Sequence, residues 1–312
     1  MPSALLGSRT DLLVVAGRRA SRIDPRTGRV TARAPVLAAA TPLGHEPAVA
    51  LAGLLWAASA PTRTGVVTLR GYAPATLSLR RTYRVGGFRG RAPVVSLATD
   101  PAGQVAWLAA GHSIVALSLA TGQVRQHLTA GPGELLALAV SPDGRWLFDA
   151  VSRPGYTADD GNSVLQTRRI PSGAVTAEVG GSPAPGHDAV LVGAVQQIIA
   201  TPAGIWVEGA AGSRSFQAAT LLSHRLRPRP FAAAAASTGG PDAVVISTTP
   251  NRAWIGGGST GTACYTARTA RLVAHDRDHS YADVTLAGRR LYAIDIIGND
   301  KRLVEINSPG GC

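Results

Sequence analysis

One short pattern recurs along the whole chain, and this repeat constrains the fold more than any other feature. Each copy consists of an apolar strand, a turn rich in Pro and Gly, and a second strand that usually carries an aromatic residue. The seven copies are DLLVVAG at 11–17, AGLLWAAS at 52–59, PAGQVAWLAAG at 101–111, SPDGRWLFDA at 141–150, TPAGIWVEGA at 201–210, TPNRAWIGGG at 249–258 and LAGRRLYAID at 286–295. A repeat of this kind predicts a series of similar small units that stack on one another.

The aromatic residues keep a fixed place in this repeat. All five tryptophans lie in the second strand of a copy, namely Trp56, Trp107, Trp146, Trp206 and Trp254. Tyr292 takes this place in the last copy, and Leu13 marks it in the first. We expect the rings to fill the gap between neighbouring sheets, where an aromatic ring typically buries about 150–250 Å². The alternative, a stacking platform for a ligand, is disfavoured because alternation along the strand directs the rings into that gap.

A second, weaker repeat follows the strand pairs. IDPRTGRV at 23–30, SLATGQV at 118–124 and IPSGAV at 170–175 each read as a strand, a turn with Gly and another strand. Each unit therefore has four short antiparallel strands over about 40–50 residues, which is the size of a propeller blade. The predicted fold is all-β: a single seven-bladed β-propeller domain over residues 1–312, with six or eight blades as alternatives. The expected blades are 1–40, 48–86, 93–131, 134–181, 189–230, 241–277 and 280–312.

The segments SPDGRWLF and SGAVTAEVGGSPA (172–184) resemble the YVTN-type and WD-repeat-like propellers of bacteria. The resemblance covers the chain as an architecture, and it implies the fold more than any chemistry. The Trp-Asp pair and upstream Gly-His of true WD repeats are missing. The streptogramin lyases and sugar lactonases use related propellers, so the resemblance also leaves an enzyme as an alternative.

The chain is strongly basic, with a formal net charge of +12 and Lys301 as its only lysine. The arginines are scattered, apart from one local cluster at Arg80, Arg81, Arg84, Arg89 and Arg91. A solvated basic surface explains this distribution, and the scattered arginines therefore disfavour nucleic acid as a partner. No apolar run reaches the roughly 20 residues of a membrane-spanning helix.

The two cysteines are expected to form a disulfide. Cys264 lies in the third strand of the sixth unit, where it aligns with Arg22 of the first, and Cys312 ends the seventh unit. Neighbouring blades bring such positions close together, and the bond would close a loop of 48 residues. Free thiols are the alternative. A disulfide favours an extracytoplasmic or secreted protein, although the first residues, MPSALLGSRT, carry no export signal. A cytoplasmic protein is therefore the other interpretation.

The densest group of polar residues is AHDRDHSYAD at 274–283, between the sixth and seventh units. Its imidazole and carboxylate groups suit a divalent metal, so His275, Asp278 and His279 are the candidate ligands, with His187 as a further one. The alternative is an ordinary polar loop with Asp-based turns. No other cofactor is expected.

No motif for nucleophilic catalysis or phosphate binding occurs in the chain. The leading hypothesis is therefore a monomeric, non-catalytic propeller of a bacterial cell envelope that presents a loop face to a protein or saccharide ligand. A metal-assisted lyase or hydrolase that uses the residues at 274–283 is the second hypothesis.

Overall fold

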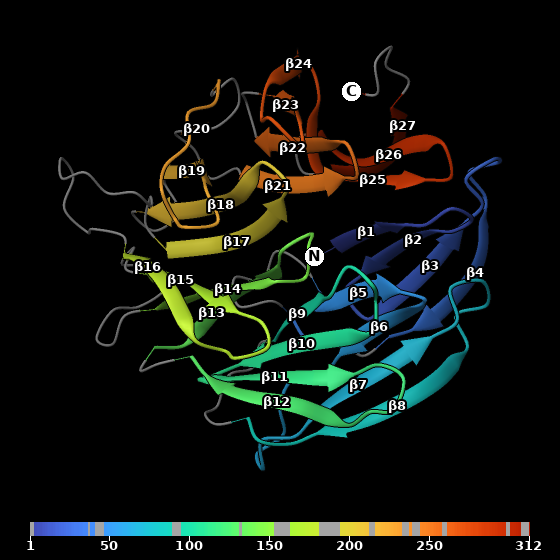
Figure 1. The fold of residues 1–312 in the computed structure, drawn as a ribbon. Helices are drawn as coiled ribbons and strands as arrows, with labels where there is room; N and C mark the ends of the chain where they lie inside the picture. Colours follow the sequence, from blue (N-terminus) through green and yellow to red (C-terminus); the bar gives the residue numbers. More distant parts are fainter. Residues whose placement is uncertain are drawn as a thin grey trace. The chain divides into compact units, whose positions relative to one another are not determined.

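The computed structural model describes residues 3–36, 38–40, 47–88, 95–130, 133–152, 163–180, 194–211, 216–232, 237–238, 244–257, 261–297, 300–306 and 312. These residues form β-strands and no helix, as predicted (Figure 1). The strands of the described residues belong to seven antiparallel sheets, which form the blades of a seven-bladed β-propeller.

Within each sheet, the strands are arranged side by side in the order in which they follow one another in the sequence. The first blade contains β1 (Ser3–Gly7), β2 (Leu12–Ala16), β3 (Arg19–Ile23) and β4 (Val30–Pro35). The second contains β5 (Val49–Ala52), β6 (Leu54–Ala58), β7 (Val67–Tyr72) and β8 (Leu79–Val85). The third contains β9 (Ser96–Thr99), β10 (Val105–Ala110), β11 (Ser113–Ser118) and β12 (Val124–Thr129).

The remaining blades continue this order. The fourth contains β13 (Leu135–Val140), β14 (Trp146–Ser152), β15 (Ser163–Arg169) and β16 (Val175–Gly180). The fifth contains β17 (Ala194–Thr201), β18 (Gly204–Ala211), β19 (Phe216–Leu222) and β20 (Ser237–Thr238). The sixth contains β21 (Val244–Thr249), β22 (Arg252–Gly257), β23 (Gly261–Thr266) and β24 (Leu272–Asp276). The seventh contains β25 (Ser280–Ala287), β26 (Arg290–Ile297) and β27 (Asp300–Ile306).

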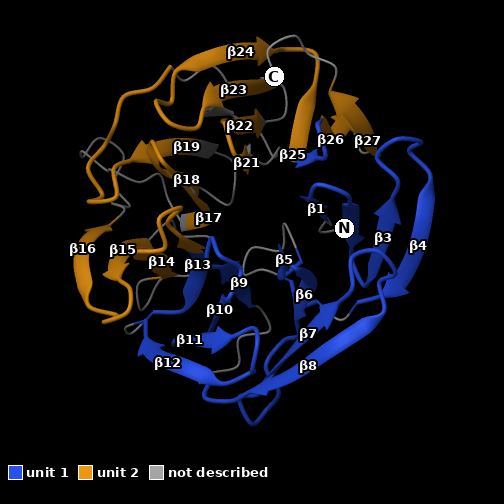
Figure 2. Ribbon diagram, turned by 45° about the vertical axis from the view of Figure 1, so that its right-hand side comes forward, with its two compact units in different colours: residues 1–138, 286–289 blue, residues 139–285, 290–312 orange. Residues whose placement is uncertain are grey.

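The chain divides into two compact units, coloured separately in Figure 2. The first unit comprises residues 1–138 and 286–289, and the second comprises residues 139–285 and 290–312. In the first unit, β1 pairs with β2 from Ser3↔Ala16 to Gly7↔Leu12. This pairing assigns Ser3–Gly7 to the first blade.

A β-bulge recurs where the third strand of a blade meets the fourth. In five blades of the described residues the register shifts by one residue immediately after the position occupied by Arg22, Gly71, Ala116, Thr167 or Cys264. A bulge inserts one extra residue into the fourth strand and bends it. The bulge therefore gives an alignment of the blades that is independent of the sequence repeat, and it places Cys264 and Arg22 at equivalent positions, as the sequence alignment did.

The second strands follow the same alignment. The five positions before the bulge lie on the third strands, and each pairs with a residue of the second strand. These second-strand residues include Leu13, Trp56, Trp107 and Trp254, all of them buried. In the remaining two blades Trp206 and Tyr292 are the third residues of their strands and are also buried. Trp56 packs with Val67 and Leu108, and Trp206 with Ile246 and Ile255, so rings of this set lie in the hydrophobic clusters that join neighbouring blades.

Trp146 departs from the predicted register. It is the first residue of β14 and is only partly buried, whereas Phe148, two residues later, is fully buried and lies opposite Thr167. Phe148 therefore occupies the position that the sequence analysis assigned to Trp146. The error arose because the two aromatics point to the same face of one strand, and the sequence pattern gave preference to the larger ring.

Candidate functional site

A cleft of about 530 Å³ lies in the second unit beside the predicted site residues. Its walls come from β24, from the turn that follows it, from the start of β25 and from β27, together with Cys312. His275, Asp276, His279, Tyr281 and Glu305 supply the polar groups of the lining. Ala274, Val304 and Ile306 supply its apolar part. The cleft thus combines several hydrogen-bonding groups with an apolar wall, which is the usual composition of a small-ligand site.

His279 is held by a carboxylate from β26, the second strand of the seventh blade. Its Nδ1 lies 3.0 Å from Oδ2 of Asp295 on β26. The imidazole is 48% exposed, but the carboxylate is only 1% exposed. This hydrogen bond to Asp295 raises the pKa of His279, and the negative charges of Asp276 and Asp278 act in the same direction. The other oxygen of Asp295, Oδ1, is buried and has no hydrogen-bond partner among the described residues.

Asp276 organises the turn that carries His279. Its Oδ1 accepts hydrogen bonds from the backbone N–H groups of Asp278 at 2.9 Å and His279 at 3.2 Å. Its Oδ2 lies 3.5 Å from the hydroxyl of Tyr281, which donates to it. Burial, followed by the charge of Asp276, raises the pKa of Tyr281 to about 12, so this phenol stays protonated at neutral pH. The rings of His279 and Tyr281 are stacked, with centroids 5.9 Å apart.

The candidate metal ligands are only partly brought together. His275 and His279 both line the cleft, whereas Asp278 is exposed and does not line it. In the part of the chain that the structure describes, no group of three or more His, Cys, Asp or Glu side chains is arranged to hold a metal ion. His187 lies outside the described residues. A divalent metal at these residues stays a prediction.

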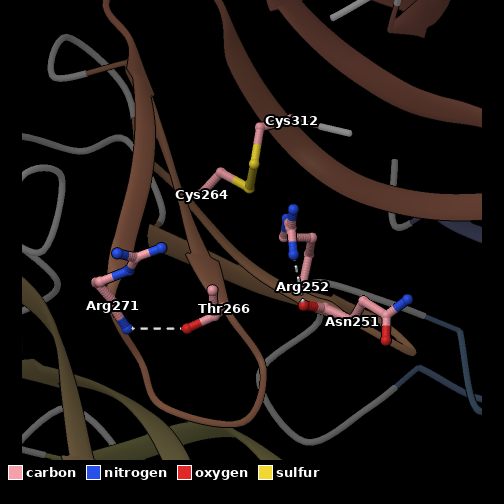
Figure 3. The surroundings of a disulfide bond; sticks show 6 residues. All are labelled: Asn251, Arg252, Cys264, Thr266, Arg271 and Cys312. Atoms are coloured by element: carbon pink, nitrogen blue, oxygen red, sulfur yellow. Dashed lines mark hydrogen bonds between the residues drawn. A yellow bond between two sulfur atoms is a disulfide. The ribbon is translucent and has the colours of Figure 1, made fainter. Parts of the chain in front are cut away.

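The predicted disulfide is present in the structure (Figure 3). Its Cys312 is among the residues that line the cleft. The bond joins Cys264 of β23 to Cys312, with the two Cα atoms 6.0 Å apart. Cys264 is buried beside Trp254, Tyr281 and Val284, and Cys312 packs against the same cluster. The bond therefore attaches the last residue of the chain to the packed interior below the cleft.

Several residues that shape the cleft were not predicted from the sequence. Asp295, Tyr281 and Glu305 were not among the candidate residues. Asp295 and Glu305 belong to the last sequence repeat and to the strand after it, where nothing distinguishes them from other polar residues of a strand. Tyr281 was visible inside the segment 274–283, and an aromatic next to alternating His and Asp residues was the available signal.

Comparisons with known proteins support the fold and reach no family. No protein-family model matches the chain, and no curated protein matches it in sequence. Many solved structures are similar in fold. A structure of U3-55K has a TM-score of 0.61 at 13% identity, covering 94% of this chain and 87% of that one. The Kuenenia stuttgartiensis hydrazine synthase has a TM-score of 0.59 at 14% identity, covering 98% and 96%. A chain of the mitotic checkpoint complex has a TM-score of 0.58 at 13% identity, covering 94% and 86%. At these identities the likeness shows the β-propeller fold alone.

Proposed function

We propose that this protein is a non-catalytic binding propeller that holds a saccharide in the cleft beside β24, β25 and β27. The observation that carries the proposal is the set of groups around one cavity. Carboxylates of Asp276 and Glu305 accept hydrogen bonds from hydroxyl groups, and the imidazole of His279 donates them. Val304 and Ile306 supply apolar contacts for the C–H groups of a sugar ring. A volume of about 530 Å³ suits a small ligand, since such sites typically enclose about 300–1,000 Å³.

A protein ligand is the second candidate. One of the similar structures belongs to a complex, the mitotic checkpoint complex, and this likeness favours a propeller that contacts other proteins. A stable protein interface typically needs about 800 Å² on each partner, which is much more than this cleft offers. The cleft itself therefore favours the saccharide. No observation on the described residues favours the metal-assisted lyase or hydrolase.

The disulfide supports an extracytoplasmic or secreted protein. A disulfide such as Cys264–Cys312 persists in oxidising compartments and is rare in the cytosol. Among the described residues no helix has the length and apolar character needed to cross a membrane. We further propose that the seven blades act as one domain and that the protein is a monomer.

Binding to a glycan array, followed by calorimetric titration of the strongest hit, tests the proposed function. The informative variant is Asp276→Asn, because the amide oxygen still accepts the two backbone hydrogen bonds of the turn while the negative charge is lost. We expect affinity to fall roughly tenfold, since the carboxylate oxygen left for the ligand becomes an amide NH2 group, which donates instead of accepting, and the negative charge is lost. Asp300→Asn is the matched control, because this exposed carboxylate on β27 lies outside the cleft lining.

Three outcomes would contradict the proposal. The first is that no glycan binds. The second is that a peptide library gives the only ligands, which would support the protein-binding alternative. The third is that Asp276→Asn and Asp300→Asn leave glycan affinity equally unchanged, which would place the ligand elsewhere on the molecule.

A further inference from the structure

Blades two and three carry more than half of the net positive charge of the protein. Residues 48–131 contain eight arginines and one acidic residue, a net charge of +7 out of +12 for the chain. The single carboxylate, Asp100, is occupied in a turn, where its Oδ1 accepts the backbone N–H groups of Gln104 at 2.6 Å and Val105 at 2.8 Å. Within residues 48–131 the arginines therefore far outnumber the carboxylates.

Three of them line a cleft of about 520 Å³ in the first unit. Arg80 and Arg81 come from β8 of the second blade, and Arg125 comes from β12 of the third. All three are exposed. In the part of the chain that the structure describes, neither Arg80 nor Arg125 has a carboxylate at ion-pair distance. Gln104 and Ser118 add neutral polar groups to the lining, and Ala52, Leu54 and Trp56 add apolar ones.

The recurring β-bulge explains why these arginines meet. The inserted residue of the bulge is Arg80 in β8 and Arg125 in β12, so the two side chains occupy equivalent positions in neighbouring blades. Side chains normally alternate between the two faces of a strand, and an inserted residue changes that alternation. Arg80 and the following Arg81 can therefore line the same cleft. In the other three blades with this bulge the inserted residue is Thr31, Thr176 or Val273.

Arg81 is fixed in position by the third blade. Its Nη1 donates to the carbonyl oxygens of Leu119 at 2.8 Å and Ala120 at 2.5 Å. Tyr83 donates its hydroxyl to the same Leu119 oxygen at 3.0 Å, and its ring stacks on Trp56 with centroids 5.7 Å apart. Nε and Nη2 of Arg81 have no hydrogen-bond partner among the described residues, so they remain available as donors. A guanidinium that is already ordered loses less conformational freedom when it binds an oxyanion.

We propose that this cleft is a binding site for the sulfate or phosphate group of an acidic saccharide, and that Arg80, Arg81 and Arg125 are its ligands. Guanidinium groups bind planar and tetrahedral oxyanions through paired, charge-assisted hydrogen bonds. Gln104, which is exposed, can bond a neutral hydroxyl of the same ligand. A single-stranded nucleic acid fits less well, because such sites use exposed aromatic rings for base stacking, and Trp56 is buried. Arginines that only protect an exposed strand edge would not need to converge on one cavity.

Titration of the full chain with five probes tests the site: glucose phosphate, glucose sulfate, glucose, inorganic phosphate and a single-stranded oligonucleotide. The informative variant is Arg80→Gln combined with Arg125→Gln. The matched control is Arg63→Gln combined with Arg84→Gln, because these exposed arginines of the same unit lie outside the cleft lining and their replacement changes the net charge equally. We expect the charged sugars to bind and glucose not to. Their affinity should fall roughly tenfold or more in the cleft variant and change little in the control.

Several results would overturn the proposal. Absence of binding by both charged sugars is the most direct. An equal loss in the cleft variant and the control would show diffuse attraction to a basic surface rather than a site. If inorganic phosphate binds as tightly as glucose phosphate, the site recognises the anion alone and not a saccharide. If the oligonucleotide binds more tightly than either charged sugar, the ligand is a nucleic acid. Thermal unfolding shows whether the cleft variant and the control are folded. If the cleft variant is not folded, the single variants Arg80→Gln and Arg125→Gln are titrated in its place. Because this cleft and the one beside β24 contain different residues, either proposal can fail without the other.

Discussion

The cleft beside β8 and β12 and the cleft beside β24, β25 and β27 have nearly equal volumes, about 520 and 530 Å³, but opposite chemical character. Three arginines line the first, and two carboxylates and two histidines line the second. The difference extends to the surrounding blades: residues 48–131 carry a net charge of +7, whereas residues 241–312 contain eight basic and seven acidic residues, a net charge of +1. The same type of blade therefore supports two clefts with different charged groups in their linings.

The differences lie at a few equivalent positions of the repeat. At the inserted position of the bulge, Arg80 and Arg125 correspond to Val273 in the sixth blade. At the position before the bulge, Gly71 and Ala116 correspond to Cys264. At the inserted position, the sixth blade lacks the positive charge that blades two and three have. At the position before the bulge, the sixth blade has one of the two cysteines of the disulfide. The inserted position is exposed in all three blades, so its side chain can change without loss of the fold. The position before the bulge is buried, and at Gly71 a side chain would clash with Leu54 and Trp56.

The largest effect is expected from removal of the disulfide, which borders only the cleft beside β24, β25 and β27. Replacing Cys264 and Cys312 together by Ala should lower the free energy of unfolding by about 4 kcal/mol, from the loop-closure entropy of a 48-residue separation. Urea denaturation measures this loss. Hydrogen exchange should show the loss of protection mainly in β23 and β24, whereas β10 and β11 should stay as protected as in the unmodified protein.

Reduction of the unmodified protein provides the control for this variant. A reductant should lower the stability of the unmodified protein to about that of the double variant and leave the variant unchanged. Equal loss of protection in both clefts, or no loss of stability, would contradict the idea that the disulfide supports the second cleft in particular.

A smaller effect is expected at the cleft beside β8 and β12, whose lining is held by hydrogen bonds and not by a disulfide. Tyr83→Phe keeps the ring that stacks on Trp56 and removes the hydroxyl that donates to Leu119. We expect a loss of about 1 kcal/mol in the free energy of unfolding, the usual contribution of one hydrogen bond. Tyr72→Phe is the matched control, since no hydrogen bond of the Tyr72 hydroxyl occurs among the described residues. An equal effect of the two substitutions would contradict the role assigned to Tyr83.

The sequence was sufficient for the features that repeat and insufficient for those that depend on register. The spacing of Trp56, Trp107 and Trp254 identified the blades, and the alignment of Cys264 with Arg22 led to the disulfide. The bulge has no sequence pattern of its own, because it arises from the pairing of two strands. The meeting of Arg80 with Arg125, 45 positions later in the chain, was therefore not predicted, although the cluster that contains Arg80 was.

The second cleft shows the same limit. His279 was a candidate because it lies in a dense polar segment, but its partner Asp295 is 16 residues away on another strand. Alternation within β26 gave no reason to expect a buried carboxylate at that position. Trp146 illustrates the opposite error, in which a conspicuous residue was preferred and Phe148, the residue that the register selects, was passed over.

The smallest expected effect is a pH dependence confined to the second cleft. Because Asp295 raises the pKa of His279 in the folded protein, the protonated imidazole stabilises the fold. This contribution is fully present below the pKa of an unfolded histidine, about 6.5, and it is lost as the pH rises through the higher pKa of the folded state. His279→Gln should therefore be less stable than the unmodified protein at pH values below that range, and the difference should shrink at higher pH. Since the imidazole is half exposed, we expect the difference to stay below about 1 kcal/mol. His127→Gln, at an exposed histidine of the first unit, is the control, and a pH-dependent difference of equal size there would show that the effect does not come from the His279–Asp295 pair.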